Sequence, residues 1–152
     1  WERWDGYVQG RGYQDPGMNS FCHYAIGSVG EWMYRTILGI NPDPANPGYK
    51  HFFIKPVPGG GLQWAKGKYE SIHGPIVSDW KVDGGLLKLR LSVPANTQAT
   101  LYLPATDPAN VTEGGNAIKE AAGVKFVKMD GPAAVYELGS GSYEFVSRQF
   151  QK

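Results

Sequence analysis

The pattern of apolar positions changes near residue 50, and the two sides of that change predict different kinds of structure. Before it, apolar residues recur at helical spacing, whereas after it they alternate with polar residues in short runs. Apolar residues three and four apart indicate a helix, and strict alternation indicates a strand with one buried face. The sequence therefore predicts a helical segment followed by a β-rich domain.

The predicted helix runs from Asn19 to Leu38. Asn19 or Ser20 is a suitable N-cap, Gly39 suits a left-handed C-cap, and the prolines that follow prevent continuation. Apolar residues cover most sides of this helix: Phe21, Ala25, Ile26, Val29, Trp32, Met33 and Ile37. Such a helix is normally buried between other helices, as in a bundle or a helical barrel. Because the sequence shows no second helix, we expect its packing partners to be missing.

The last hundred residues predict seven or eight short strands: 50–56, 62–71, 75–83, 86–94, 99–104, 124–129, 133–138 and the closing stretch 139–148. The clearest is 86–94, where leucines and a valine alternate with Lys88, Arg90 and Ser92. No helical crossovers separate the strands, so we expect antiparallel pairing. The predicted fold class is mainly β, an antiparallel β-sandwich over residues 50–152 preceded by the helical segment of residues 1–49.

The composition of the chain narrows the classes of partner and site that we expect. The 15 Lys and Arg residues almost match the 14 Asp and Glu residues, so we expect neither a nucleic acid partner nor an anionic membrane. No apolar run approaches the roughly 20 residues that span a bilayer. The single cysteine, Cys22, excludes an internal disulfide, and His23, His51 and His73 lack the spacing of metal ligands. We therefore expect no metal and no cofactor, and the compartment is not determined.

The opening WERWDG places Glu2 between two indoles. A lone glutamate near a terminus is most often a solvated charge. Here, Trp1 and Trp4 can also stack on a sugar ring, and glycosidic cleavage needs one carboxyl group as acid and another as base. His23, near the start of the predicted helix, is either a core histidine or a neutral imidazole that binds a sugar hydroxyl.

Three further aromatic residues lie on the predicted strands. Trp64, Tyr69 and Trp80 can form a sugar-binding platform on the sandwich, or they can fill its core. The second use is the commoner one for aromatic residues in strands.

Long consecutive motifs resemble one known family. WERWDG, MNSFCHYAIGSVGEWMYRTILGI and PGYKHFFIKPVPGGGLQWAKGKYESIHGPIVSDWK are similar to the C-terminal end of bacterial α-L-rhamnosidases, the inverting enzymes of glycoside hydrolase family 78. The resemblance continues through LSVPANTQATLYLPA and, more loosely, to SGSYEFVSR. It implies that residues 1–49 are the remnant, with the last helix, of an (α/α)6 barrel that carries the active site. Residues 50–152 are then the C-terminal β-sandwich.

The resemblance also implies roles for individual residues. Glu2 matches the catalytic base of the family, and His23 matches a histidine that contacts rhamnose. Trp1 and Trp4 belong to the same motif and are assigned a supporting role in substrate binding. The general acid of the family lies earlier in the barrel. We therefore expect a fragment that is inactive alone, from a parent enzyme that removes terminal α-L-rhamnose from glycosides or polysaccharides.

Two other interpretations of the sandwich remain open. The sandwich is either an independent carbohydrate-binding module that uses Trp64, Trp80 or Tyr69, or a purely structural module. In the absence of the barrel, we expect the apolar helix to pack against the sandwich or against the same helix of another copy, which would cause self-association.

Overall fold

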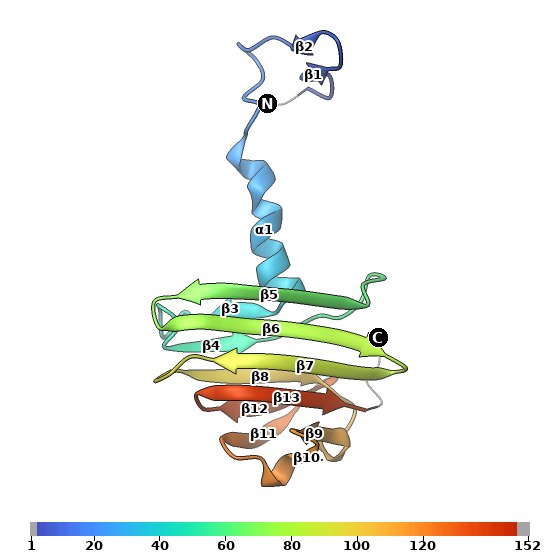
Figure 1. Cartoon of the computed structure of the whole chain (residues 1–152). Helices are drawn as coiled ribbons and strands as arrows, with labels where there is room; N and C mark the ends of the chain where they lie inside the picture. Colours follow the sequence, from blue (N-terminus) through green and yellow to red (C-terminus); the bar gives the residue numbers. More distant parts are fainter. Residues whose placement is uncertain (1–2, 149–152) are drawn as a thin grey trace. The chain divides into compact units, whose positions relative to one another are not determined.

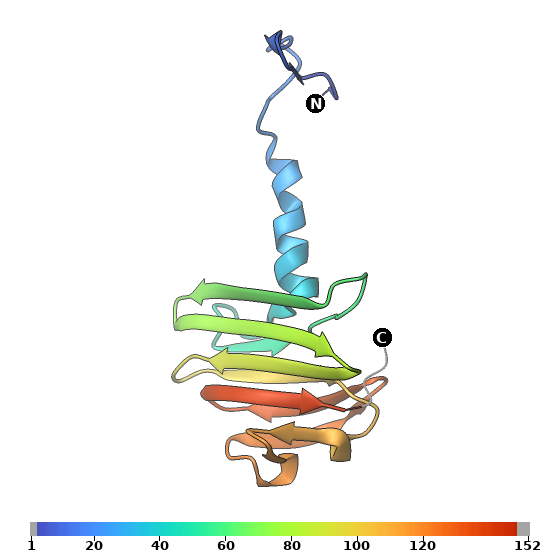
Figure 2. The same cartoon turned by 45° about the vertical axis from the view of Figure 1, so that its right-hand side comes forward.

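The computed structural model describes residues 3–148. These residues form two compact units, and the boundary between the units falls between Trp32 and Met33 in the sequence. The first unit contains the two-stranded ribbon of β1 (Tyr7–Val8) and β2 (Gly12–Tyr13), followed by η1 (Tyr24–Gly27) and α1 (Ser28–Trp32). The second unit begins with η2 (Met33–Ile37) and continues as a sandwich of two sheets (Figures 1 and 2).

The larger sheet has six strands, all paired antiparallel, in the order β10-β9-β13-β7-β6-β5. Their bounds are β5 (Trp64–Ser71), β6 (Gly74–Asp83), β7 (Leu86–Val93), β9 (Val111–Glu113), β10 (Asn116–Ala117) and β13 (Gly141–Ser147). The alternation predicted for β7 is confirmed, because Leu87, Leu89, Leu91 and Val93 are buried while Lys88 and Arg90 are exposed.

The smaller sheet has five strands in the order β11-β12-β8-β4-β3. Their bounds are β3 (Ile40–Pro42), β4 (His51–Ile54), β8 (Gln98–Pro104), β11 (Val124–Asp130) and β12 (Ala133–Leu138). The antiparallel expectation holds for this sheet except for β4 and β8, which are parallel. Parallel neighbours need a long crossover, and here three strands of the opposite sheet, β5, β6 and β7, supply it in place of a helix.

The core lies between the two sheets. Its largest fully buried side chains are Trp80 and Phe145 from the six-stranded sheet and Phe52 and Tyr136 from the five-stranded sheet. Two short 3-10 helices, η3 (Pro108–Asn110) and η4 (Ile118–Glu120), lie in the connection between β8 and β11. Aromatic rings from both sheets thus pack together with Leu, Ile and Val side chains in the core of the sandwich.

The helical segment is shorter than predicted. It begins at η1 and passes from 3-10 through α to π geometry before it ends at Ile37. The N-cap is His23, whose Nδ1 accepts a hydrogen bond from Ala25 N at 3.1 Å, and not Asn19 or Ser20. The prediction was wrong by several residues because Asn19 is used elsewhere, inside the preceding loop.

The end of the helical segment is tied to the sandwich. Trp80 Nε1 donates to Ile37 O at 2.7 Å, and Ser78 Oγ donates to Leu38 O at 2.7 Å. The last carbonyls of a helix have no partner within the helix, so two buried side chains of β6 satisfy carbonyls that would otherwise be unpaired. The chain then reverses at Gly39, which has a φ of +78°, as expected for a left-handed C-cap.

Gly39 also lies against the backbone of Lys55 and Pro56, directly after β4. A Cβ at this position would lie 2.2 Å from Pro56 N, whereas a Cβ at Gly85, which has a similar φ of +80°, would meet nothing within 4 Å. Both alanine variants incur the roughly 1–2 kcal/mol cost of a left-handed conformation. We expect Gly39→Ala to lower the free energy of unfolding by at least about 2 kcal/mol more than Gly85→Ala, because only Gly39→Ala creates a backbone overlap. Urea unfolding of both variants measures the difference, and equal losses would contradict the assigned packing.

The hydroxyl of Tyr136 is an exception to the satisfied core. It is buried between the sheets without a hydrogen-bond partner among the described residues, and burial, with a smaller effect of Asp107, raises the pKa of Tyr136 to about 12. Above pH 10 an unfolded tyrosine ionises while this one does not. The folded state therefore loses stability as the pH rises from about 10 to about 12.

We expect Tyr136→Phe to be as stable as the parent chain or more stable at pH 7, because it removes an unpaired buried hydroxyl. It should also lose less stability between pH 10 and pH 12, by up to about 2–3 kcal/mol. Tyr143→Phe is the control, since the Tyr143 hydroxyl donates to Gly139 O at 2.9 Å and its loss should cost about 1 kcal/mol at pH 7. Thermal unfolding at pH 7, 10 and 12 measures these effects. A loss in Tyr136→Phe as large as that in Tyr143→Phe would show that the Tyr136 hydroxyl has a partner.

Candidate functional site

Asn19 organises the loop that follows the opening motif. Its side chain is only 4% exposed, and its Oδ1 accepts from Arg3 N at 2.8 Å. Its Nδ2 donates to Gln14 O at 3.0 Å and to Asp15 O at 3.1 Å. One buried amide therefore joins the start of the loop to its end.

The predicted site residues Trp1 and Glu2 lie outside the described residues. Trp4 is fully exposed, and beside it Arg3 Nε lies 3.2 Å from Asp5 Oδ1 in an exposed ion pair. The amide of Arg3, which Asn19 holds, belongs to the peptide bond that joins Arg3 to Glu2. The structure thus anchors the chain immediately after the predicted catalytic base.

His23 is positioned by the helix that follows it. Its Nδ1 is the N-cap acceptor, and its ring stacks on Tyr24 with centroids 4.9 Å apart and an interplanar angle of 20°. An acceptor nitrogen carries no proton, so the neutral ring has its proton on Nε2.

The first unit exposes many aromatic rings. Tyr13 packs edge-on against Tyr7 and against Phe21, with centroid separations of 5.3 and 4.8 Å. All three rings remain exposed, as do Tyr24 and Trp32. Soluble proteins rarely leave so many large apolar side chains uncovered on so short a segment, and such patches mark interaction surfaces.

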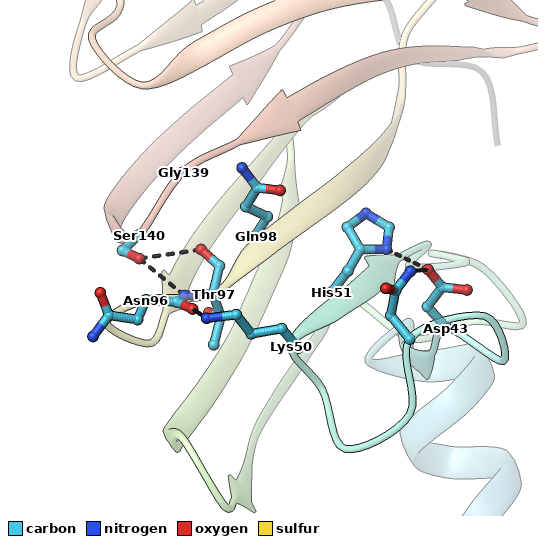
Figure 3. A pocket seen from close by; sticks show the side chains of 9 residues that line it. Asp43, Lys50, His51, Asn96, Thr97, Gln98, Gly139 and Ser140 are labelled. Carbon is cyan, nitrogen blue, oxygen red and sulfur yellow. Dashed lines mark hydrogen bonds and ion pairs between the residues drawn. The ribbon is translucent and has the colours of Figure 1, made fainter.

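The second unit has a polar hollow of about 730 Å³ at one end of β4 and β8. Figure 3 shows Asp43, Lys50, His51 and Ser140 among its lining residues. His51 Nδ1 lies 2.7 Å from Asp43 Oδ2, and His51 Nε2 lies 2.9 Å from Thr100 Oγ1. Asp43 was not among the predicted site residues, because the outward position of His51 on β4 indicates that the ring needs a polar partner but not which residue supplies it.

The order of carboxylate, imidazole and hydroxyl resembles that of a hydrolase triad, but its partners give it a structural role. Asn46 Nδ2 donates to Asp43 Oδ2 at 2.8 Å, and Ala45 N donates to Asp43 Oδ1 at 2.9 Å. The hydrogen bond from the Asn46 amide is the largest cause that lowers the pKa of Asp43. The bond from Ala45 N and the contact with His51 lower it further. The network therefore fastens the loop after β3 to β4 and β8.

The three aromatic residues on the predicted strands do not form one platform. Trp80 is 2% exposed, and Tyr69 packs half-buried against Tyr49 with centroids 4.6 Å apart. Trp64, by contrast, is 62% exposed. Trp80 and Tyr69 thus fill the core, and only Trp64 of the three faces solvent.

Within residues 3–148, no three or more His, Cys, Asp or Glu side chains gather in a group that could hold a metal ion. Over the same residues, every helix is too short or too polar to cross a bilayer. Cys22 is exposed.

Two family models match the chain. Residues 39–117 match the bacterial alpha-L-rhamnosidase C-terminal domain, and residues 1–37 match the bacterial alpha-L-rhamnosidase 6 hairpin glycosidase domain. An α-L-rhamnosidase of Streptomyces avermitilis is 44% identical over 147 residues, which is 95% of this chain and 13% of that protein. An α-L-rhamnosidase of Formosa agariphila is 32% identical over 97% of this chain and 16% of its own length.

Solved structures agree with these matches. The Streptomyces avermitilis α-L-rhamnosidase complexed with L-rhamnose superimposes with a TM-score of 0.79 and 42% identity, over 97% of this chain and 13% of that one. The native α-L-rhamnosidase of Aspergillus terreus superimposes with a TM-score of 0.71 and 35% identity, over 99% of this chain and 14% of that one. The chain thus spans about one seventh of the length of these relatives. Since the C-terminal domain model alone covers more than half of the chain, this protein belongs to the family of the bacterial α-L-rhamnosidase C-terminal domains.

Proposed function

We propose that this chain is the C-terminal part of an α-L-rhamnosidase that removes terminal α-L-rhamnose from glycosides or polysaccharides. The observation that carries the proposal is the continuous match to α-L-rhamnosidases over 95% of the chain at 44% identity. The match to the glycosidase domain over residues 1–37 supports a contribution of this segment to the active site. Rhamnose is the ligand named for the Streptomyces avermitilis structure.

In the proposed mechanism Glu2 is the general base. Inversion needs a carboxylate that activates water and a carboxylic acid about 6.5–9.5 Å away that protonates the leaving oxygen. We assign the acid to the part of the glycosidase domain that this sequence does not contain. His23 donates from Nε2 to a rhamnose hydroxyl, and Trp1 and Trp4 contact the sugar. With one carboxylate of the pair, the chain alone is inactive.

The proposed domains are a barrel remnant over residues 1–49 and a sandwich over residues 50–152. Within this division, β3 of the first segment already pairs with β4 in the five-stranded sheet of the sandwich. In this arrangement the sandwich acts as a support that holds the end of the last barrel helix through Ser78 and Trp80. Residues Val29, Trp32 and Met33 are exposed, so self-association of the isolated chain through this helix remains part of the proposal.

The catalytic assignment predicts a difference between this chain and a longer protein with a complete glycosidase domain. The 152-residue chain should not hydrolyse an aryl α-L-rhamnoside, whereas the longer protein should release rhamnose with inverted configuration. Glu2→Gln in the longer protein should lower kcat by about 10²–10⁴-fold, because the general base is lost. Glu120→Gln, on the exposed η4 of the sandwich, is the matched control and should leave kcat unchanged. Turnover by the short chain, or full activity of Glu2→Gln, would refute the assignment.

The geometry of Asn19 predicts that it positions the residue after the base. Asn19→Ala removes three hydrogen bonds of the loop, so the Arg3 amide should exchange with solvent at least about tenfold faster. In the longer protein kcat should fall while the unfolding of the sandwich is unchanged. Asn116→Ala, whose amide makes one long bond of 3.4 Å to Gly114 O, is the control for loss of a carboxamide. Unchanged exchange at Arg3 would exclude the positioning role.

A further inference from the structure

The outer face of the six-stranded sheet carries a shallow hollow of about 420 Å³, within the usual size range of small-molecule sites. It extends over β5, β6, β7 and β13, which lie side by side in Figures 1 and 2. Its lining includes four cationic side chains but only two carboxylates: Lys66, Lys81, Lys88 and Arg90 against Asp79 and Glu144. The chain as a whole is nearly neutral, so this excess of positive charge is local.

One row of cross-strand neighbours in the hollow has the charge pattern of an ordinary solvent-exposed sheet surface. Lys66 pairs across strands with Asp79, Asp79 with Arg90, and Arg90 with Glu144, so the charges alternate in sign. Opposite charges facing each other across strands are stabilising. This row needs no ligand to explain it.

The adjacent row does not follow this rule. Trp64 pairs with Lys81, and Lys81 pairs directly with Lys88. Like charges in directly opposed positions are destabilising. Asp83 compensates only weakly, since its Oδ2 lies 3.8 Å from Lys81 Nζ and 3.9 Å from Lys88 Nζ and its side chain is 57% exposed. An anion placed between the two ammonium groups would remove the conflict.

The Arg90 guanidinium next to these lysines is held in place. Its Nη2 donates to Asp79 Oδ2 at 2.5 Å, and that contact raises the pKa of Arg90. The Asp79 side chain is itself largely buried, and its Oδ1 has no partner among the described residues. The anchor leaves the other N–H groups of Arg90 as donors beside the hollow, since a guanidinium carries five.

An exposed aromatic ring closes one side of the hollow. Trp64 lies on the edge strand β5 and is 62% exposed, although a tryptophan of this size is usually highly buried. A flat indole beside fixed cationic donors combines an apolar face with groups that bind oxygen anions, a combination that suits an acidic sugar. An extended hydrophobic interface is less consistent with a surface in which charged side chains predominate.

We propose that Trp64, Lys81, Lys88 and Arg90 bind an anionic saccharide unit, in which the ring stacks on the indole and the acidic group lies between the two lysines. Carboxylated and sulfated sugars share this chemistry. The site is separate from the residues proposed for catalysis, so the inference does not depend on Glu2 or on the activity of a longer protein.

The test is a titration of the 152-residue chain with trigalacturonic acid. Binding is monitored by indole fluorescence and by NMR of the lysine side chains. Its fully methyl-esterified form, which has the same sugar rings without charge, and a sulfated galactotriose are the comparison ligands. The acid should bind at least tenfold more tightly than the ester, and its affinity should fall as ionic strength rises. A stronger response to the sulfated sugar would identify sulfate as the preferred group, with the same residues involved.

Variants then locate the site. Trp64→Ala and the pair Lys81→Gln, Lys88→Gln should each weaken binding of the acid at least tenfold. The paired lysine variant should also be at least as stable as the parent chain, because it removes the repulsion. The matched control is Lys125→Gln with Lys128→Gln, which removes the same charge from β11 of the other sheet. Equal loss in the control would show non-specific attraction and overturn the proposal, as would equal affinity for acid and ester or no binding at millimolar concentration.

Discussion

The structure depends on how the helical segment ends. Two carbonyl groups, those of Ile37 and Leu38, accept hydrogen bonds from Trp80 and Ser78 of β6, and Gly39 then turns the chain into the sandwich. A buried indole and a buried hydroxyl would each be costly without a partner, and so would the carbonyls. Each group satisfies another, so these two hydrogen bonds stabilise the sandwich core and the helix end together. A displacement of the helix end relative to β6 would therefore break these hydrogen bonds.

The two faces of the six-stranded sheet have different roles. The inner face is committed to packing, with Trp80 and Phe145 buried against the opposite sheet. The outer face is free of that demand and carries charges, some of which are arranged against local stability. Natural sequences depart from locally favourable patterns where a function compensates for the cost. The paired lysines beside Trp64 are such a departure, whereas the Asp43–His51–Thr100 network, with every partner satisfied, is not.

The N-terminal unit is built differently, around a single amide. Asn19 joins Arg3 to the segment near Gln14, and His23 then caps the first helical turn. Polar side chains therefore shape the loop, while its aromatic side chains remain exposed. A loop of this kind positions residues with little apolar burial of its own, so its order depends on a few hydrogen bonds. In the proposed function this loop carries the histidine that contacts the sugar, and it directly follows the proposed base.

Short runs of strand-forming residues between turns were enough to locate the eight longest strands of the sandwich. Alternation is clearest in β7, whose side chains must alternate because only one face is buried, whereas β11 is exposed along almost its whole length. The glycine after the helix was equally readable, since a left-handed C-cap accepts few other residues. Three features could not be predicted from the sequence. They are the parallel pairing of β4 with β8, the roles of Asn19 and His23 as loop anchor and helix cap, and the Asp43–His51 contact. Each joins residues through an arrangement that local periodicity does not encode. Sequence alone determined which residues alternate, turn and resemble a family, whereas the tertiary structure decided which side chains meet, because hydrogen-bond partners are chosen by distance in space.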